Sequence, residues 1–140
     1  MSISEELRSR IGVQADHRCG YCQSSQRYVF APLEVDHILP RAYGGADDED
    51  NLWLACLICN GFKSARMDAV DPLTGESVRL FNPRRQNWID HFAWSTSGVQ
   101  IVGLTPTGRA TVMALNLNNV IAAMVRHEWV SAGWHPPVKD

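Results

Sequence analysis

The sequence predicts an α+β fold whose centre is a β-hairpin followed directly by a helix. Three features indicate this: two short apolar runs flanking a glycine-containing loop, a helical pattern directly after the second run, and a CxxC pair on each side of the hairpin. At 140 residues and 45% hydrophobic, the chain is long enough for one compact domain. We therefore expect a single domain over residues 1–140.

The first expected element is a helix at about residues 4–15. Ser4 can cap it, and two acidic residues follow in its first turn. An imperfect apolar stripe runs along it through Leu7, Ile11, Val13 and Ala15. No signal-peptide pattern opens the chain, and its apolar stretches fall well short of the ~20 residues of a membrane span. We expect a cytoplasmic protein with no membrane partner.

The central hairpin is expected from strands at residues 33–39 and 51–55. The loop between them contains Gly44 and Gly45, which can adopt positive φ. A helix is expected from Leu57 to about Arg66. Its spacing places three polar or sulfur-containing residues near one face: Cys56, Asn60 and Lys63.

Residues 67–140 are expected to form a C-terminal extension. Its predicted elements are a short strand near 78–81 within a turn-rich passage, a strand pair at 91–95 and 99–104, and helices at 105–115 and 118–132. Thr105 and Asn118 are the expected helix caps. The aromatic residues here are expected to pack in a core: Trp88, Phe92, Trp94, Trp129 and Trp134.

The net charge of −2 argues against a protein that coats nucleic acid indiscriminately. The charges are unevenly distributed, because acids concentrate at residues 47–50 and eleven of the thirteen cations are arginine. Arginine's rigid fork suits phosphate contacts. Several arginines of the extension could therefore form a phosphate-binding surface, or could simply be solvated: Arg84, Arg85, Arg109 and Arg126.

The cysteines form two CxxC pairs, Cys19/Cys22 and Cys56/Cys59. In a cytosolic chain this pattern points to metal rather than to disulfides. Two such turns complete a tetrahedral zinc site, which would hold the two ends of the hairpin together. The alternatives are a thioredoxin-like redox pair or four unrelated buried cysteines. Neither pair convincingly opens a helix in a βαβ context, and the coincidence of two pairs favours zinc.

Four polar residues between and beside the cysteine pairs are not explained by a hydrophobic core: Asp36, His37, Asn51 and Asn60. A phosphodiester hydrolase needs a base for water and a hard cation for the phosphate. Adjacent strand residues point to opposite faces unless the strand is twisted or bulged. A metal-bound Asp36 next to a His37 that faces water would therefore need other residues to hold both side chains in place. Each of these residues alone could equally be an ordinary turn, strand or helix-end residue. The interpretation therefore depends on their joint spacing with the cysteines.

This ordered set resembles the HNH endonuclease family. The residues that carry the resemblance are Asp36-His37-Ile38-x-Pro40, Gly44-Gly45, Asn51-Leu52 and Cys56-x-x-Cys59-Asn60-x-x-Lys63. The resemblance covers about Cys19 to Arg66 and implies a ββα-metal core that cleaves nucleic acid. The four cysteines match the zinc-binding subgroup of the family, in which that ion is structural.

The resemblance also implies roles for individual residues. His37 would be the general base, Asp36 and Asn60 the ligands of a catalytic divalent cation, and Asn51 the residue that holds the metal loop and the base. Asn60 stands where the family often has histidine, a variant also found in the HNH domain of CRISPR effector nucleases. An Asp/Asn oxygen pair favours Mg²⁺ or Mn²⁺.

The sequence thus predicts a zinc-stapled, metal-dependent HNH nuclease that cuts DNA. Residues 16–66 would be the nuclease core, and residues 67–140 an α/β extension packed on it. Lys63, Arg66 and Arg41 are expected to contact nucleic acid. The alternative is a catalytically silent zinc module that binds nucleic acid or protein. DNA or RNA preference, sequence specificity and oligomeric state stay open.

Overall fold

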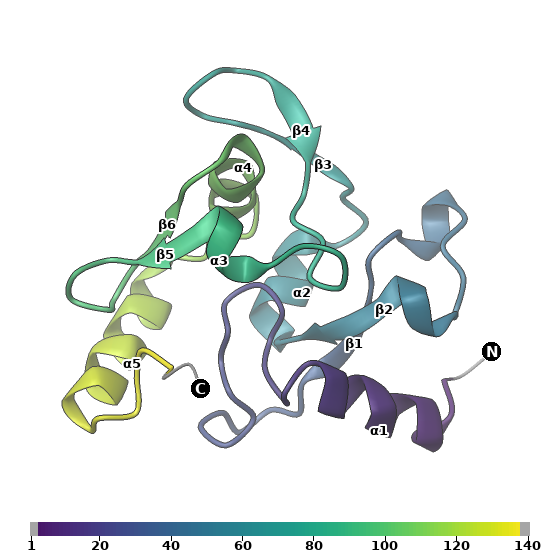
Figure 1. The fold of residues 1–140 in the computed structure, drawn as a ribbon, viewed down its shortest axis with the longest axis horizontal. Helices are drawn as coiled ribbons and strands as arrows, with labels where there is room; N and C mark the ends of the chain where they lie inside the picture. The colour runs from purple at the N-terminus through teal and green to yellow at the C-terminus, as the bar shows by residue number, and fades with distance from the viewer. Residues whose placement is uncertain (1–2, 138–140) are drawn as a thin grey trace.

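The computed structural model describes residues 3–137, so both ends of the expected domain, residues 1–2 and 138–140, lie outside it. Its helices and strands (Figure 1) are α1 (Glu5–Gln14), β1 (Glu34–His37), β2 (Leu52–Ala55), α2 (Leu57–Lys63), β3 (Asp68–Val70), β4 (Ser77–Arg79), α3 (Trp88–His91), β5 (Phe92–Trp94), β6 (Ile101–Gly103), α4 (Pro106–Ala114) and α5 (Val120–Ser131). The strands form three separate antiparallel pairs, β1–β2, β3–β4 and β5–β6. The predicted α+β class is confirmed.

The centre of the chain is the expected hairpin followed by a helix. Glu34 lies opposite Ala55 and His37 opposite Leu52, and α2 begins two residues after β2 ends. Helix α1 covers the hairpin through a small core in which Ile11 and Leu52 are fully buried. Val13 is 68% exposed, so the apolar stripe predicted for α1 is wrong at this position.

The loop between β1 and β2 uses its two glycines differently. Gly44 has φ +90°, the left-handed conformation that glycine adopts at least cost. Gly45 does not have positive φ, so the expectation for this residue is wrong. A Cβ on Gly45 would overlap the Leu39 carbonyl oxygen, so glycine is required here by close backbone approach.

The extension contains the predicted strand pair and both predicted helices. Thr105 caps α4 by accepting a hydrogen bond from the Gly108 amide. The predicted cap of α5 is wrong by one residue: Asn119 caps that helix, whereas the Asn118 side chain accepts from the amide of Ile101 and donates to its carbonyl. Two further elements, β3 and α3, were not predicted, because they are short and lie among turn residues.

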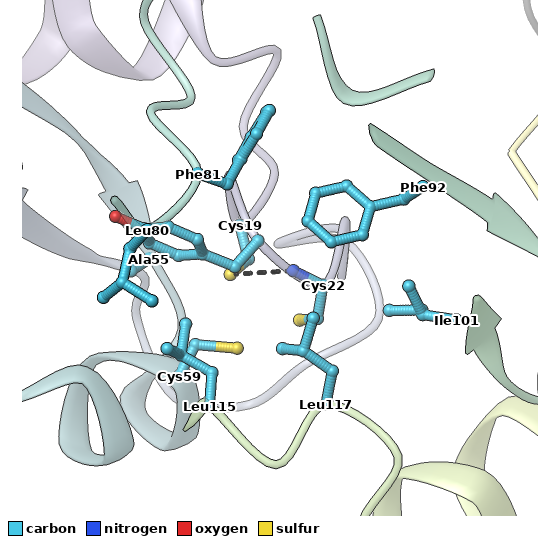
Figure 2. Packing of buried hydrophobic residues seen from close by; sticks show 11 residues of the cluster. Cys19, Cys22, Ala55, Cys59, Leu80, Phe81, Phe92, Ile101, Leu115 and Leu117 are labelled. Carbon is cyan, nitrogen blue, oxygen red and sulfur yellow. Dashed lines mark hydrogen bonds between the residues drawn. The ribbon is translucent and has the colours of Figure 1, made fainter. Parts of the chain in front are cut away.

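The larger core joins the extension to the hairpin unit. Figure 2 shows the sulfur atoms of Cys19, Cys22 and Cys59 beside Leu115 and Leu117, on the side of the cluster away from the extension's aromatic rings. Two aromatic residues predicted to pack, Trp88 and Trp94, lie against this cluster, and the Trp88 indole donates to the Tyr21 carbonyl at 2.9 Å. Burial of this apolar surface is the main stabilising contribution available to the fold.

Arginines hold the extension in place. Arg84 donates to the Leu52 carbonyl at 3.0 Å and lies 4.9 Å from the Trp53 ring centroid. Arg126 is buried and donates to the Leu117 carbonyl at 2.7 Å, and Arg109 forms a two-pronged pair with buried Asp71. A phosphate-binding surface made of Arg84, Arg109 and Arg126 is therefore wrong, because their guanidinium groups are used inside the fold.

None of the helices in the described part of the chain combines the length and hydrophobicity that crossing a membrane requires.

Candidate functional site

The four cysteines converge beside the base of the hairpin. Their Sγ atoms all lie within 4.8 Å of one another, and those of Cys22 and Cys56 are 3.7 Å apart. A tetrahedral ion with Zn–S bonds of ~2.3 Å places its sulfurs roughly 3.8 Å apart, close to this spacing. No disulfide links these cysteines. The donor set and its spacing therefore fit a structural zinc ion, as predicted.

Local backbone structure shapes this cluster. The Cys22 amide points to the Cys19 sulfur at 3.5 Å, and the Cys59 amide points to the Cys56 sulfur at 3.4 Å. Cys56 is also the N-cap of α2, so one sulfur both opens the helix and joins the cluster. Amide donors of this kind stabilise negative charge on the sulfurs, as metal binding requires.

A buried ion pair joins β1 to α2. Asp36 is 3% exposed and Lys63 is 2% exposed, with Lys63 Nζ 3.1 Å from Asp36 Oδ1. The other carboxylate oxygen accepts from the Tyr21 hydroxyl at 2.7 Å. Lys63 Nζ also donates to the His37 carbonyl at 2.9 Å. Asp36, predicted as a metal ligand, therefore already has a cationic partner in Lys63.

Burial controls the protonation of this cluster. Loss of solvent raises the pKa of Asp36, while Lys63 and then Tyr21 act in the opposite direction. Burial, followed by the Asp36 charge, raises the pKa of Tyr21 well above its usual value. Tyr21 therefore stays protonated and donates its hydrogen bond.

Asn60 and Glu34 meet next to this pair. Asn60 Nδ2 donates to Glu34 Oε1 at 2.7 Å, and both residues are half-buried. The amide oxygen of Asn60 has no hydrogen-bond partner within residues 3–137. The face thus presents oxygen donors from Glu34, Asp36 and Asn60, which is the chemistry that a hard divalent cation requires. Glu34 and Asn60 are the accessible donors, and Asp36 is shared with Lys63.

His37 lies on the opposite side of the strand, as its adjacency to Asp36 indicated. Its Nε2 atom is 2.7 Å from Asp47 Oδ1. His37 first, and then Arg41, lower the pKa of Asp47, so this carboxylate is ionised and accepts hydrogen bonds. Arg41 Nε also lies 3.2 Å from His37 Nε2. Because the ionised Asp47 carboxylate is closer to this nitrogen, we assign the imidazole proton to Nε2. The other ring nitrogen, Nδ1, then carries a lone pair and has no hydrogen-bond partner in the described part of the chain.

The Asn51 side chain holds the loop between His37 and Asp47 in place by hydrogen bonds. It accepts from the Leu39 amide at 2.8 Å and donates to the Leu39 and Ala46 carbonyls at 3.1 and 3.0 Å. These bonds close the segment between His37 and Asp47. The Asn51 side chain therefore contacts the backbone of the loop and not the His37 imidazole.

The three residues expected to contact nucleic acid lie in different environments. Arg41 is exposed and donates to Asp47 at 2.9 Å, and Arg66 is exposed and donates to the Ala114 carbonyl at 3.1 Å. Lys63 is buried against Asp36. Its expected phosphate contact is therefore wrong, because its ammonium group is enclosed and already hydrogen-bonded.

Sequence reasoning overlooked Tyr21 and Asp47 as members of the site. Glu34 was expected to be an exposed strand residue or a spare ligand on the same face as Asp36, and the structure places it half-buried against Asn60. For Glu34 the available signal was its i, i+2 relation to Asp36, which puts both on one face of a strand. Asp47 was visible only as part of an acidic run. Tyr21 lies between the first two cysteines, and no pattern in the sequence links it to Asp36.

Comparison with protein families agrees with this geometry. Residues 19–66 match the family model described as HNH endonuclease. The hairpin and helix held by four cysteines are thus an HNH domain with a Cys-type metal site, the class that the motif spacing predicted. Comparison with curated proteins and with solved structures gave no match.

Proposed function

We propose that this chain is a metal-dependent endonuclease that hydrolyses phosphodiester bonds in DNA, with His37 as the general base. The observation that carries the proposal is the His37 side chain, oriented by Asp47 on the strand that also carries Glu34 and Asp36, within residues that match the HNH family. Membership of this domain family supports nucleic acid as the substrate class.

His37 would accept a proton from the attacking water at Nδ1. Asp47 would stabilise the imidazolium that forms, because its carboxylate accepts a hydrogen bond from the Nε2–H group. Two contacts fix the position of this ring: Lys63 holds the His37 carbonyl, and Asn51 holds the following loop. In this proposal Asp47, Lys63 and Asn51 are positioning residues.

A divalent cation, Mg²⁺ or Mn²⁺, would be held by Asp36 and Asn60, with Glu34 as a further oxygen donor. When bound, such an ion stabilises charge on the phosphate and the leaving oxygen. The chain's own contribution is to keep these donors on one face, through β1 and the first turns of α2.

A second function is favoured by the Asp36–Lys63 contact. Lys63 already supplies the positive charge that balances Asp36, so the domain could be a zinc-stabilised binding module without catalysis. Such a module would bind nucleic acid or protein through its exposed surface.

Plasmid nicking separates the two functions. The zinc-loaded protein is incubated with supercoiled DNA, with no further metal or with added Mg²⁺ or Mn²⁺. The nuclease proposal expects relaxed or linear product only with the added divalent ion. If DNA is bound but stays supercoiled under every ion tested, the binding module is the correct function.

A further inference from the structure

The chain contains a basic cleft between the HNH core and the extension. The cleft has a volume of about 340 Å³, and none of the residues that line it is acidic. Its cationic lining comes from α2 and the residues after it, from β4 and from the turn before α3: Lys63, Arg66, Arg79 and Arg85. Because the chain as a whole has a net charge of −2, this is a local concentration of positive charge.

Three of these four cations remain accessible. Lys63 is committed to Asp36, whereas Arg66, Arg79 and Arg85 are all exposed. Arg66 uses one guanidinium nitrogen on the Ala114 carbonyl, and the Arg85 guanidinium has no partner within residues 3–137. Donors of this number and type suit a phosphodiester group, whose oxygens accept paired hydrogen bonds from arginine.

Arg79 also has a competing partner. Arg79 Nε lies 3.2 Å from Asp68 Oδ1, and the side chains of Arg79 and Asp68 are 72% and 47% exposed. Exposed ion pairs of this kind contribute little and exchange readily with another anion. Arg79 can therefore turn to a phosphate at small cost.

The cleft lies at the end of β1, the strand that carries His37. Ile38 lines it and directly follows His37 in the chain. We propose that this cleft binds a backbone phosphate of the DNA strand that passes the HNH site, through Arg66, Arg79 and Arg85. This inference rests on the proposed function for the identity of the ligand, but the cleft includes residues of the extension that lie beyond the family match.

A binding measurement without Mg²⁺ or Mn²⁺ tests the cleft separately from catalysis. The probes are a fluorescein-labelled 20-base-pair DNA duplex and one of its single strands, titrated with zinc-loaded protein at several KCl concentrations. The test variant is Arg79→Ala/Arg85→Ala. The matched control is Arg8→Ala/Arg27→Ala, which removes two exposed arginines outside the cleft and so makes the same change in net charge.

We expect the cleft variant to bind at least about tenfold more weakly than the control variant. For duplex DNA, the slope of log K against log salt should fall by roughly 1.8, at about 0.9 for each lost phosphate contact. A loss confined to the duplex identifies double-stranded DNA as the ligand, and an equal loss on both probes identifies the backbone of one strand.

The cleft proposal is overturned if the two variants bind both probes alike, or if the wild-type protein binds neither. Failure of the proposed function gives a different result. In that case, wild-type protein binds DNA through the cleft but does not cut it when Mg²⁺ or Mn²⁺ is added.

Discussion

Lys63 shows how a residue of the motif can serve the fold before it serves the substrate. Its ammonium group is enclosed and bonds to Asp36 and to the His37 carbonyl, so it ties α2 to the end of β1. A buried carboxylate and a buried ammonium group are each costly alone and tolerable together. The position of the proposed base therefore depends on this pair.

Replacing Lys63 with methionine should destabilise the protein by about 3–5 kcal/mol, because Asp36 would remain buried without its cation. Urea unfolding in the presence of zinc measures the change. The double variant Asp36→Asn/Lys63→Met is the control and should recover much of the loss, since both charges are removed. A cost below about 1 kcal/mol for the single variant would show that this pair does not hold the site.

At the scale of secondary structure, the turn between β3 and β4 is tied to α4 by one ion pair. Asp71, in that turn, is fully buried and accepts two hydrogen bonds from Arg109, both at 2.9 Å, and others from the turn's Leu73 amide and Thr74 hydroxyl. Arg109 lowers the pKa of Asp71 below its usual value, against the opposing effect of burial. This arrangement explains how a short, turn-rich hairpin keeps a defined position on the molecule.

The sign of this shift predicts a pH dependence. Because the folded pKa lies below the unfolded value of about 3.9, the stabilisation is present above that pH and is lost as the pH falls toward the folded pKa. Asp71→Asn should therefore unfold at lower urea concentration than wild type at pH 7, and the gap should shrink as the pH drops below 4. A gap that is constant from pH 7 to pH 3 would contradict this role.

Several of the helices and strands could be predicted from the sequence. The β1–β2 hairpin, α2, the β5–β6 pair and α4 follow from apolar periodicity, glycines and caps, all of which are local signals. The β3 strand could not be found this way, because it is three residues long and is held by its pairing with β4 rather than by propensity. Side-chain partners were equally hidden. Asp36 was expected to bind a cation and Lys63 to contact nucleic acid, whereas the two residues form a buried pair whose burial depends on Tyr21 and on the whole core.

For the molecule as a whole, the cysteine cluster and the extension share one core. Buried residues of this core come from both sides of Arg66, including Cys19 and Cys59 before it and Phe81, Ile101 and Leu115 after it. We propose that residues 67–137 fold together with the HNH domain as one unit. A metal that holds four of these side chains then contributes to the stability of both parts.

Removing zinc with a chelator, or replacing Cys56 with serine, should therefore unfold the extension along with the hairpin. Far-UV circular dichroism and tryptophan fluorescence should change in a single coincident transition. The fluorescence reports on Trp53 in the hairpin and on the four tryptophans of the extension. Adding zinc back to the wild-type protein is the control and should restore both signals. Two separate transitions would mean that the extension has an independent core.

The rate of DNA cleavage by His37→Ala most directly tests whether His37 is the general base. His127→Ala is the matched control, because it removes an exposed histidine of α5 and leaves the HNH domain unchanged. With Mn²⁺, and with zinc content equal in all samples, His37→Ala should cut about 10²- to 10⁴-fold more slowly than wild type, while His127→Ala keeps the wild-type rate. Undiminished cleavage by His37→Ala would contradict its assignment as the general base.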